Sequence, residues 1–76
     1  MRYTVTLEWD EEGQGWFVRV PALPGCLTQG YTVEEALANA QDAIELHISG
    51  LRAHGDPVPE EHDPAILIHQ VEVKAA

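Results

Sequence analysis

The strongest constraint on the fold is a single long amphipathic helical pattern. Apolar residues recur at spacings of three and four over residues 33–51, and polar residues fall on the opposite side. Thr32 and Glu35 have the spacing of a capping box, in which the Thr32 hydroxyl accepts a hydrogen bond from the Glu35 amide and the Glu35 carboxylate accepts one from the Thr32 amide. One such helix covers one face of a sheet, so the rest of the chain should form that sheet.

The residues after the helical pattern should stop the helix. Gly55 suits a left-handed C-terminal cap, and Asp56 and Pro57 follow it, so we expect the helix to end near His54. Residues 56–64 carry three prolines and four acidic residues. We expect them to form an extended connector that returns the chain to the sheet.

Two strand-like runs precede the helix. Residues 3–9 alternate apolar and polar side chains with the period of two that is typical of a half-buried strand. Residues 10–15 form a charged loop that contains glycine, and residues 16–20 are again rich in apolar side chains. This order predicts an antiparallel hairpin.

A proline corner separates the hairpin from a third strand. Pro21, Pro24 and Gly25 interrupt regular pairing, and a short strand-like run follows over residues 26–31. Gly30 lies within this run, where we expect a bulge or a close approach of two backbones. The corner should be rigid and should fix how the third strand joins the sheet.

A last apolar run predicts a fourth strand over residues 65–73, apolar on both faces in its first half. The fold class is therefore α+β, a three-stranded antiparallel sheet with one helix and a further strand, in the order β-β-β-α-β. A chain of 76 residues with 45% hydrophobic and 22% charged residues should form one domain, residues 1–76. The two rows of the last run are Ile66 and Ile68 on one side and Leu67, Val71 and Val73 on the other.

One helix leaves the second face of the sheet uncovered. Phe17 should lie on the face opposite Trp16 and Val18, and the last run also carries apolar side chains on both faces. We therefore expect a homo-oligomer, a dimer or a tetramer, with Phe17, Ile66 and Ile68 as its candidate interface.

The charge of the chain argues against nucleic acid as a direct partner. Four lysines and arginines stand against thirteen aspartates and glutamates, a formal charge of −9, and such a surface repels phosphate backbones. The first residues alternate polar and apolar side chains, unlike a signal peptide, and no run approaches the ~18 apolar residues of a membrane span. Cys26 is the single cysteine, which fits a reducing compartment. We expect a cytoplasmic protein that binds neither nucleic acid nor membrane.

The candidate catalytic and metal-binding residues lack the necessary spacing. Cys26 is interpreted as a small buried thiol rather than as a nucleophile. Asp10 could share a cation with Glu34 or Glu45, but we expect these acidic side chains to be solvated. The histidines have no zinc-site spacing, so we expect no metal, no cofactor and no enzymatic activity. These histidines are His47, His54, His62 and His69.

Four segments occur in a specific combination: residues 3–8, Gly15-Trp16-Phe17, the corner Val20-Pro21-Ala22-Leu23-Pro24-Gly25-Cys26, and the helix start Gly30-Tyr31-Thr32-Val33-Glu34-Glu35-Ala36. Together they resemble a HicB-type antitoxin domain. The similarity runs through the helix to Pro59 and so covers most of the chain. It implies a partial RNase H-like fold without nuclease activity.

The resemblance also implies a partner. It suggests that the chain binds a small basic endoribonuclease, a HicA-type toxin, and silences it by occlusion; a charge of −9 is complementary to a protein that holds RNA phosphates. Full-length family antitoxins usually carry a C-terminal DNA-binding segment, whereas this sequence stops at Ala76, so operator binding is not expected. The alternative is a solitary HicB-like module without a toxin, acting as a homo-oligomeric adaptor or binding a small ligand. A neighbouring gene for a small basic protein would separate the two hypotheses.

Overall fold

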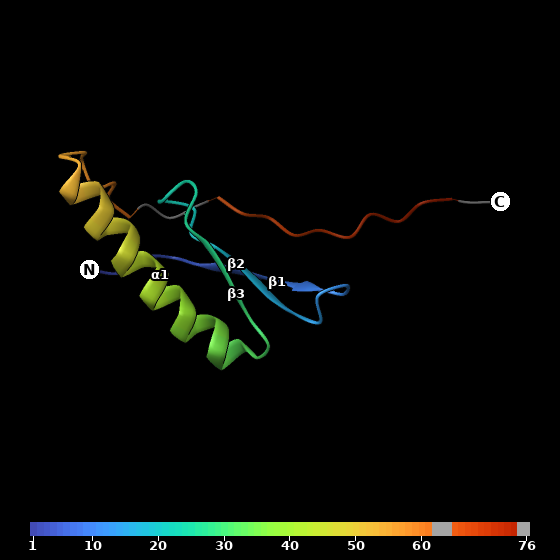
Figure 1. Cartoon of the computed structure of the whole chain (residues 1–76). Helices are drawn as coiled ribbons and strands as arrows, with labels where there is room; N and C mark the ends of the chain where they lie inside the picture. Colours follow the sequence, from blue (N-terminus) through green and yellow to red (C-terminus); the bar gives the residue numbers. More distant parts are fainter. Residues whose placement is uncertain (62–64, 75–76) are drawn as a thin grey trace.

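The computed structural model describes residues 1–61 and 65–74 (Figure 1). Its regular elements are β1 (Thr6–Asp10), β2 (Gly15–Arg19), β3 (Leu27–Gly30) and α1 (Val33–Ala53). The three strands are antiparallel and lie in the order β1-β2-β3, and α1 packs across one face of this sheet. The α+β class is therefore confirmed. No helix in the described ranges has the length and hydropathy of a membrane-spanning segment.

The hairpin register places one apolar row of the sheet under the helix. Leu7 pairs with Val18, and both side chains pack toward α1. β1 begins at Thr6, three residues later than predicted, because its partner strand β2 ends at Arg19 before the proline corner. Within the described part of the chain, residues 3–5 therefore have no neighbouring strand with which to form a ladder.

The helix contacts the sheet through small residues near its start and larger ones near its end. Ala36 and Ala40 are buried against Val18, where small side chains allow the helix to approach the sheet closely. Ile48 packs with Leu23, whose side chain is fully buried. The corner therefore contributes Leu23 to the hydrophobic core, although Pro24 and Gly25 are exposed.

The corner is held by backbone hydrogen bonds and one left-handed residue. The Leu23 amide donates to the Val20 carbonyl oxygen at 3.0 Å, and the Cys26 amide donates to the Leu23 carbonyl oxygen at 2.9 Å. Gly25 has φ +86°, a conformation that side-chain-bearing residues rarely adopt. Cys26 is buried, and burial raises the pKa of its thiol.

Residues 65–74, here called the arm, correct the prediction of a fourth strand over residues 65–73. The arm has no regular secondary structure, every one of its residues is exposed, and it extends away from the sheet (Figure 1). A strand needs a neighbour for its amide and carbonyl groups, and the arm belongs to no sheet in the described part of the chain. Over residues 1–61 and 65–74 the order of elements is β-β-β-α, and the partial RNase H-like fold stays a prediction.

Candidate functional site

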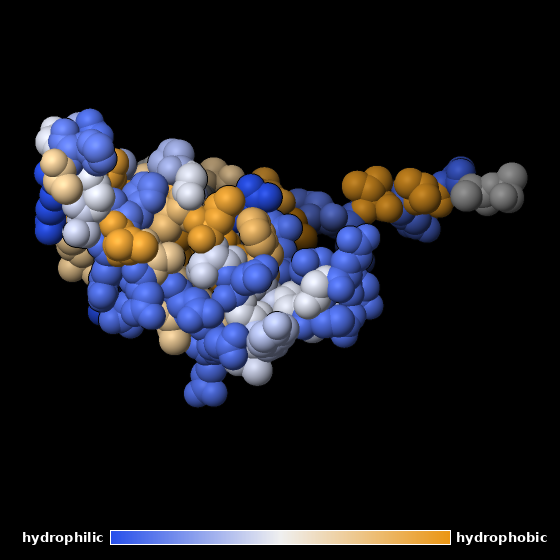
Figure 2. Space-filling model, in the orientation of Figure 1, coloured by the Kyte–Doolittle hydropathy of each residue, from blue (hydrophilic) through white to orange (hydrophobic). Residues whose placement is uncertain are grey.

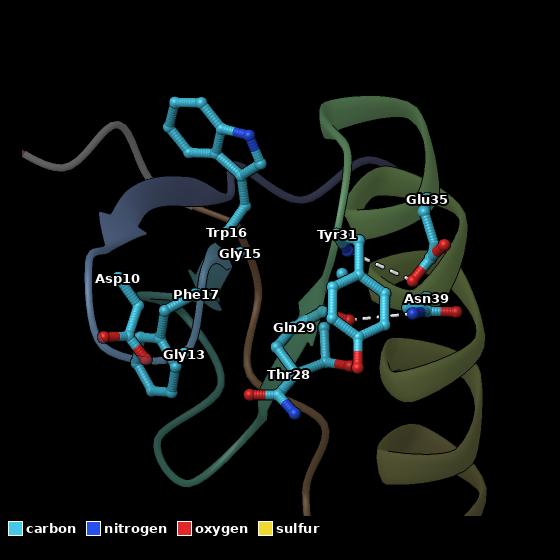
Figure 3. A pocket seen from close by; sticks show the side chains of 11 residues that line it. Asp10, Gly13, Gly15, Trp16, Phe17, Thr28, Gln29, Tyr31, Glu35 and Asn39 are labelled. Carbon is cyan, nitrogen blue, oxygen red and sulfur yellow. Dashed lines mark hydrogen bonds between the residues drawn. The ribbon is translucent and has the colours of Figure 1, made fainter.

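A hollow of about 400 Å³ lies where β2 and β3 meet the start of α1. Figure 3 shows Asp10 and Phe17 on one side of it and Glu35 and Asn39 on the other, with Tyr31 between them. Two carboxylates and no lysine or arginine line the hollow, so its surroundings are acidic. The lining residues are Asp10, Gly13, Gly15, Trp16, Phe17, Thr28, Gln29, Gly30, Tyr31, Glu35 and Asn39.

Gly30 shapes the hollow by letting β3 touch the helix. A Cβ atom at Gly30 would lie 2.7 Å from the Cα atom of Ala36, so a larger residue requires the helix or the strand to move. Gly30 is therefore a point of close approach between the backbones of β3 and α1. Because the strand and the helix meet here, Tyr31 and Glu35 are brought to the same rim.

A capping interaction fixes the start of α1 beside the hollow. Thr32 is the N-cap, and its hydroxyl accepts a hydrogen bond from the Glu35 amide at 3.0 Å, as predicted. The Glu35 carboxylate, however, accepts from the Tyr31 amide at 3.1 Å, not from the Thr32 amide (Figure 3). Tyr31 is the first residue after β3, so its amide has left the strand ladder and takes the carboxylate as its acceptor.

A side chain of α1 binds one backbone group on the outer edge of β3. The Asn39 amide group donates to the Gln29 carbonyl oxygen at 2.8 Å (Figure 3). This contact satisfies a backbone group that an edge strand would otherwise leave to solvent. The sequence interpretation missed both residues, although Asn39 follows Glu35 by four positions and therefore lies on the same side of the helix.

Two tryptophans extend the hollow onto the hairpin. Trp9 pairs with Trp16 across the strands, and their ring centroids lie 5.5 Å apart at an interplanar angle of 69°. The Trp9 indole donates to a Glu11 carboxylate oxygen at 2.7 Å. Trp9 is 46% exposed and Tyr31 is 74% exposed. We call the surface around this end of the hairpin the aromatic–acidic face. It comprises Trp9 and Trp16 on the helix side of the sheet, Asp10 on the open side, and Glu11, Tyr31 and Glu35 at the rim.

The structure separates the predicted site residues into two places. Gly30 and Glu35 line the hollow, whereas Pro21, Pro24 and Gly25 lie at the corner, at the opposite end of β2. Pro21 is half-buried, and Pro24 and Gly25 are exposed. The corner therefore supports the sheet and does not contribute to the hollow.

The predicted oligomer interface is also divided. Phe17 lies on the open face of the sheet, where the Arg19 guanidinium carbon is 5.3 Å from its ring centroid. Arg19 also forms an ion pair with Glu8 at 4.0 Å. Ile66 and Ile68 lie in the arm, outside the folded part of the chain.

The acidic residues considered for cation binding do not share a site. Asp10 lines the hollow, whereas Glu45 lines a separate groove between the N-terminal residues and α1. Among residues 1–61 and 65–74, no three His, Cys, Asp or Glu side chains are grouped closely enough to hold a metal ion. His62, one of the four histidines considered, lies outside the described residues.

Comparison with known proteins identifies the family. The family described as "HicB_like antitoxin of bacterial toxin-antitoxin system" matches residues 3–76. The chain belongs to the HicB-like antitoxin family. A UPF0150 protein of Thermoplasma acidophilum is 45% identical over 69 residues, which cover 91% of this chain and 99% of that protein. Antitoxin HicB 1 of Photorhabdus laumondii is 61% identical over 44 residues, which cover 58% of this chain and 28% of that protein.

A solved structure supports the same HicB-like assignment. The N-terminal domain of the antitoxin HicB from Burkholderia pseudomallei matches with a TM-score of 0.71 and 28% sequence identity. The match covers 84% of this chain and 74% of that chain. The three antiparallel strands and the helix are thus an arrangement found in a HicB-like domain.

Proposed function

We propose that this HicB-like chain is an antitoxin that binds a small basic endoribonuclease of the HicA type and inhibits it by occlusion, in the cytoplasm and without catalytic activity of its own. Membership of an antitoxin family supports the class of function. The observation that carries the choice of partner is the aromatic–acidic face. It combines partly exposed aromatic rings with carboxylates, and no lysine or arginine lines its hollow.

The chemistry of this face fits a basic protein partner. Exposed tyrosine and tryptophan side chains often supply most of the binding energy at protein interfaces, because they bury a large area at a small entropic cost. Carboxylates around them attract lysines and arginines that a ribonuclease uses to hold phosphate. A formal charge of −9 on the chain should also accelerate the encounter with a cationic partner.

The experiment first establishes whether a gene beside this one encodes a small basic protein. That protein is then the probe, with binding measured by calorimetry and inhibition measured as loss of RNA cleavage. We expect Tyr31→Ala to weaken binding by about 30-fold, as for an aromatic anchor of about 2 kcal/mol. Leu46→Ala is the matched control, because Leu46 is 76% exposed on α1 and lies outside the face. Equal affinities of the two variants would contradict this assignment of the face.

A charge variant tests the electrostatic part of the proposal. Asp10→Asn keeps the oxygen that accepts from the Glu12 amide at 3.2 Å but removes the negative charge. We expect slower association and a weaker dependence of the association rate on salt. Asp56→Asn, beyond the far end of α1, is the control and should associate like the parent chain. The parent chain could also fail to bind the basic protein and fail to inhibit its ribonuclease activity. That result would favour the alternative, a solitary HicB-like module that acts as an adaptor or binds a small ligand.

A further inference from the structure

The open face of the sheet is interrupted at Gly15, which has no side chain to fill its position. Asp10 pairs with Gly15 on one side, and on the other side a Cβ atom at Gly15 would lie 3.7 Å from the Cα atom of Tyr31. The backbones of Asp10 and Tyr31 are therefore about two strand spacings apart, roughly 10 Å. Phe17 follows Gly15 by two positions and closes one end of this space, which we call the Gly15 gap.

The Gly15 gap is part of the hollow and is polar. Figure 3 shows Asp10 and Phe17 on one side of it and Gln29 and Tyr31 on the other. One Asp10 oxygen accepts from the Glu12 amide at 3.2 Å, which holds the carboxylate at the rim. Figure 2 shows hydrophilic residues around the hairpin end of the molecule, in contrast to the apolar arm. A cationic guest suits this space better than an apolar one, because an apolar guest would take the carboxylate out of water without a partner.

Phe17 already binds one guanidinium group of its own chain. The guanidinium carbon of Arg19 lies 5.3 Å from the Phe17 ring centroid, and Arg19 forms an ion pair with Glu8 at 4.0 Å. Gly15 precedes Phe17 by two positions and Arg19 follows it by two, so the gap and Arg19 lie on opposite sides of the ring along β2. Asp10 follows Glu8 by two positions on β1, so each side of the ring has its own carboxylate.

We propose that the Gly15 gap binds the guanidinium group of one arginine of the basic partner, an inference that rests on the function proposed above for the source of the arginine. The flat group enters between Asp10 and Tyr31, donates to the Asp10 carboxylate and stacks against the rings of Phe17 and Tyr31. Two guanidinium groups then share Phe17 from opposite sides, each beside its own carboxylate.

The same geometry selects arginine over lysine. A guanidinium is planar, weakly hydrated and able to stack on an aromatic ring while it donates to a carboxylate. A lysine ammonium is a strongly hydrated point charge without a flat face, so it gains mainly the attraction of Asp10. The gap therefore distinguishes two residues that a negative surface charge alone attracts equally.

The first test uses small probes and no toxin. The isotope-labelled full chain is titrated with N-acetyl-L-arginine methylamide and, separately, with N-acetyl-L-lysine methylamide, which carries the same charge. In two-dimensional NMR spectra, the amide signals of Gly15 and Tyr31 and the side-chain amide signal of Gln29 should shift. Half-saturation should need about fivefold less of the arginine probe, because only the guanidinium stacks on the rings. Equal half-saturation by the two probes, or no shift at these residues, overturns the proposal.

Variants identify the groups that bind the probe. Phe17→Leu keeps an apolar side chain but removes the ring, so the preference for arginine should disappear. If that variant does not fold, as judged by circular dichroism, Tyr31→Leu gives the same test at a residue that is 74% exposed. Asp10→Asn should weaken the binding of both probes, whereas Glu45→Gln, which removes a charge from a separate groove, should weaken neither. An arginine preference that survives the loss of the aromatic ring overturns the proposal.

The second test identifies the source of the arginine. Each arginine of a HicA-type endoribonuclease is replaced by lysine in turn. One replacement should weaken binding to the parent chain about fivefold and leave binding to the Phe17→Leu or Tyr31→Leu chain unchanged, as expected for two groups in direct contact. If the ribonuclease binds and no replacement behaves in this way, the inference is overturned and the proposed function stands. If no such ribonuclease binds, the proposed function and the source of the arginine both fail, and the probe titration alone decides whether the gap selects a guanidinium.

Discussion

Strand β2 and the arm are both rich in apolar residues, yet only β2 becomes buried in the single chain. Val18 of β2 is 0% exposed because β1 and β3 flank its strand and α1 lies across its face. Ile68 of the arm is 93% exposed, since no strand or helix of residues 1–61 and 65–74 packs against it. An apolar pattern therefore indicates that a segment can be buried, and the presence of a neighbour decides whether it is.

The largest difference should appear when the same substitution is made in the two regions. Leu23→Ala removes a fully buried side chain beneath the corner and should lower the free energy of unfolding by about 2–5 kcal/mol. Leu67→Ala, in the arm, should change it by less than about 0.5 kcal/mol, because Leu67 is 83% exposed. Urea denaturation followed by tryptophan fluorescence measures both. Similar losses in the two variants would mean that the arm is packed in the monomer.

The close contact between β3 and α1 gives the next prediction. Gly30→Val places a side chain against the backbone of Ala36 and should destabilise the chain by about 2–3 kcal/mol, the upper range for overpacking. Gly50→Ala is the control, since a Cβ atom at Gly50 has no neighbour within 4 Å and alanine favours the helix by up to about 1 kcal/mol. The melting temperature should thus fall in Gly30→Val and rise in Gly50→Ala. A tolerated valine at position 30 would show that the helix can shift away.

The corner should respond through its backbone conformation. Gly25→Ala introduces a Cβ atom into open space, but the φ of +86° should cost about 1–2 kcal/mol of stability. The midpoint of urea denaturation measures this loss. An unchanged midpoint would indicate that the corner adopts another conformation at no cost and is not rigid.

The smallest effect should be the contribution of Cys26 to the pH dependence of the free energy of unfolding. Burial raises the pKa of this thiol above its value in the unfolded chain, so the unfolded state loses the proton first as pH rises. The stability that the buried Cys26 thiol adds to the folded state is complete below the pKa of the unfolded chain, about 8.5. It is lost as pH rises from there through the pKa of the folded state. Comparing denaturation at pH 7 and pH 10, we expect a smaller alkaline loss in Cys26→Ala. The same loss in both chains would exclude Cys26 as its source.

The local features of the fold were predictable because neighbouring residues determine them. The helix follows from its apolar spacing and the Thr32 cap, and the turn at Gly25 follows from a glycine between prolines and a strand. The pairing of Trp9 with Trp16 is set by the hairpin loop and could have been derived from the sequence.

The contacts around the hollow and the exposure of the arm could not be predicted from local sequence patterns. Asn39 and Gln29 meet only because α1 crosses β3, and the Glu35 carboxylate reaches Tyr31 because β3 ends one residue earlier. The arm has the composition of a strand, but pairing requires a free edge in the correct place. That requirement is a property of the assembled sheet and not of residues 65–73.

The most direct test of the toxin-binding surface is a titration of the labelled chain with a small basic endoribonuclease of the HicA type, followed by amide and indole signals in two-dimensional NMR spectra. The account predicts that the indole signals of Trp9 and Trp16 and the amide signal of Tyr31 shift as the partner is added, whereas the signals of residues 65–74 do not. Shifts confined to residues 65–74, or no shifts at all, would contradict the assignment of the aromatic–acidic face as the toxin-binding surface.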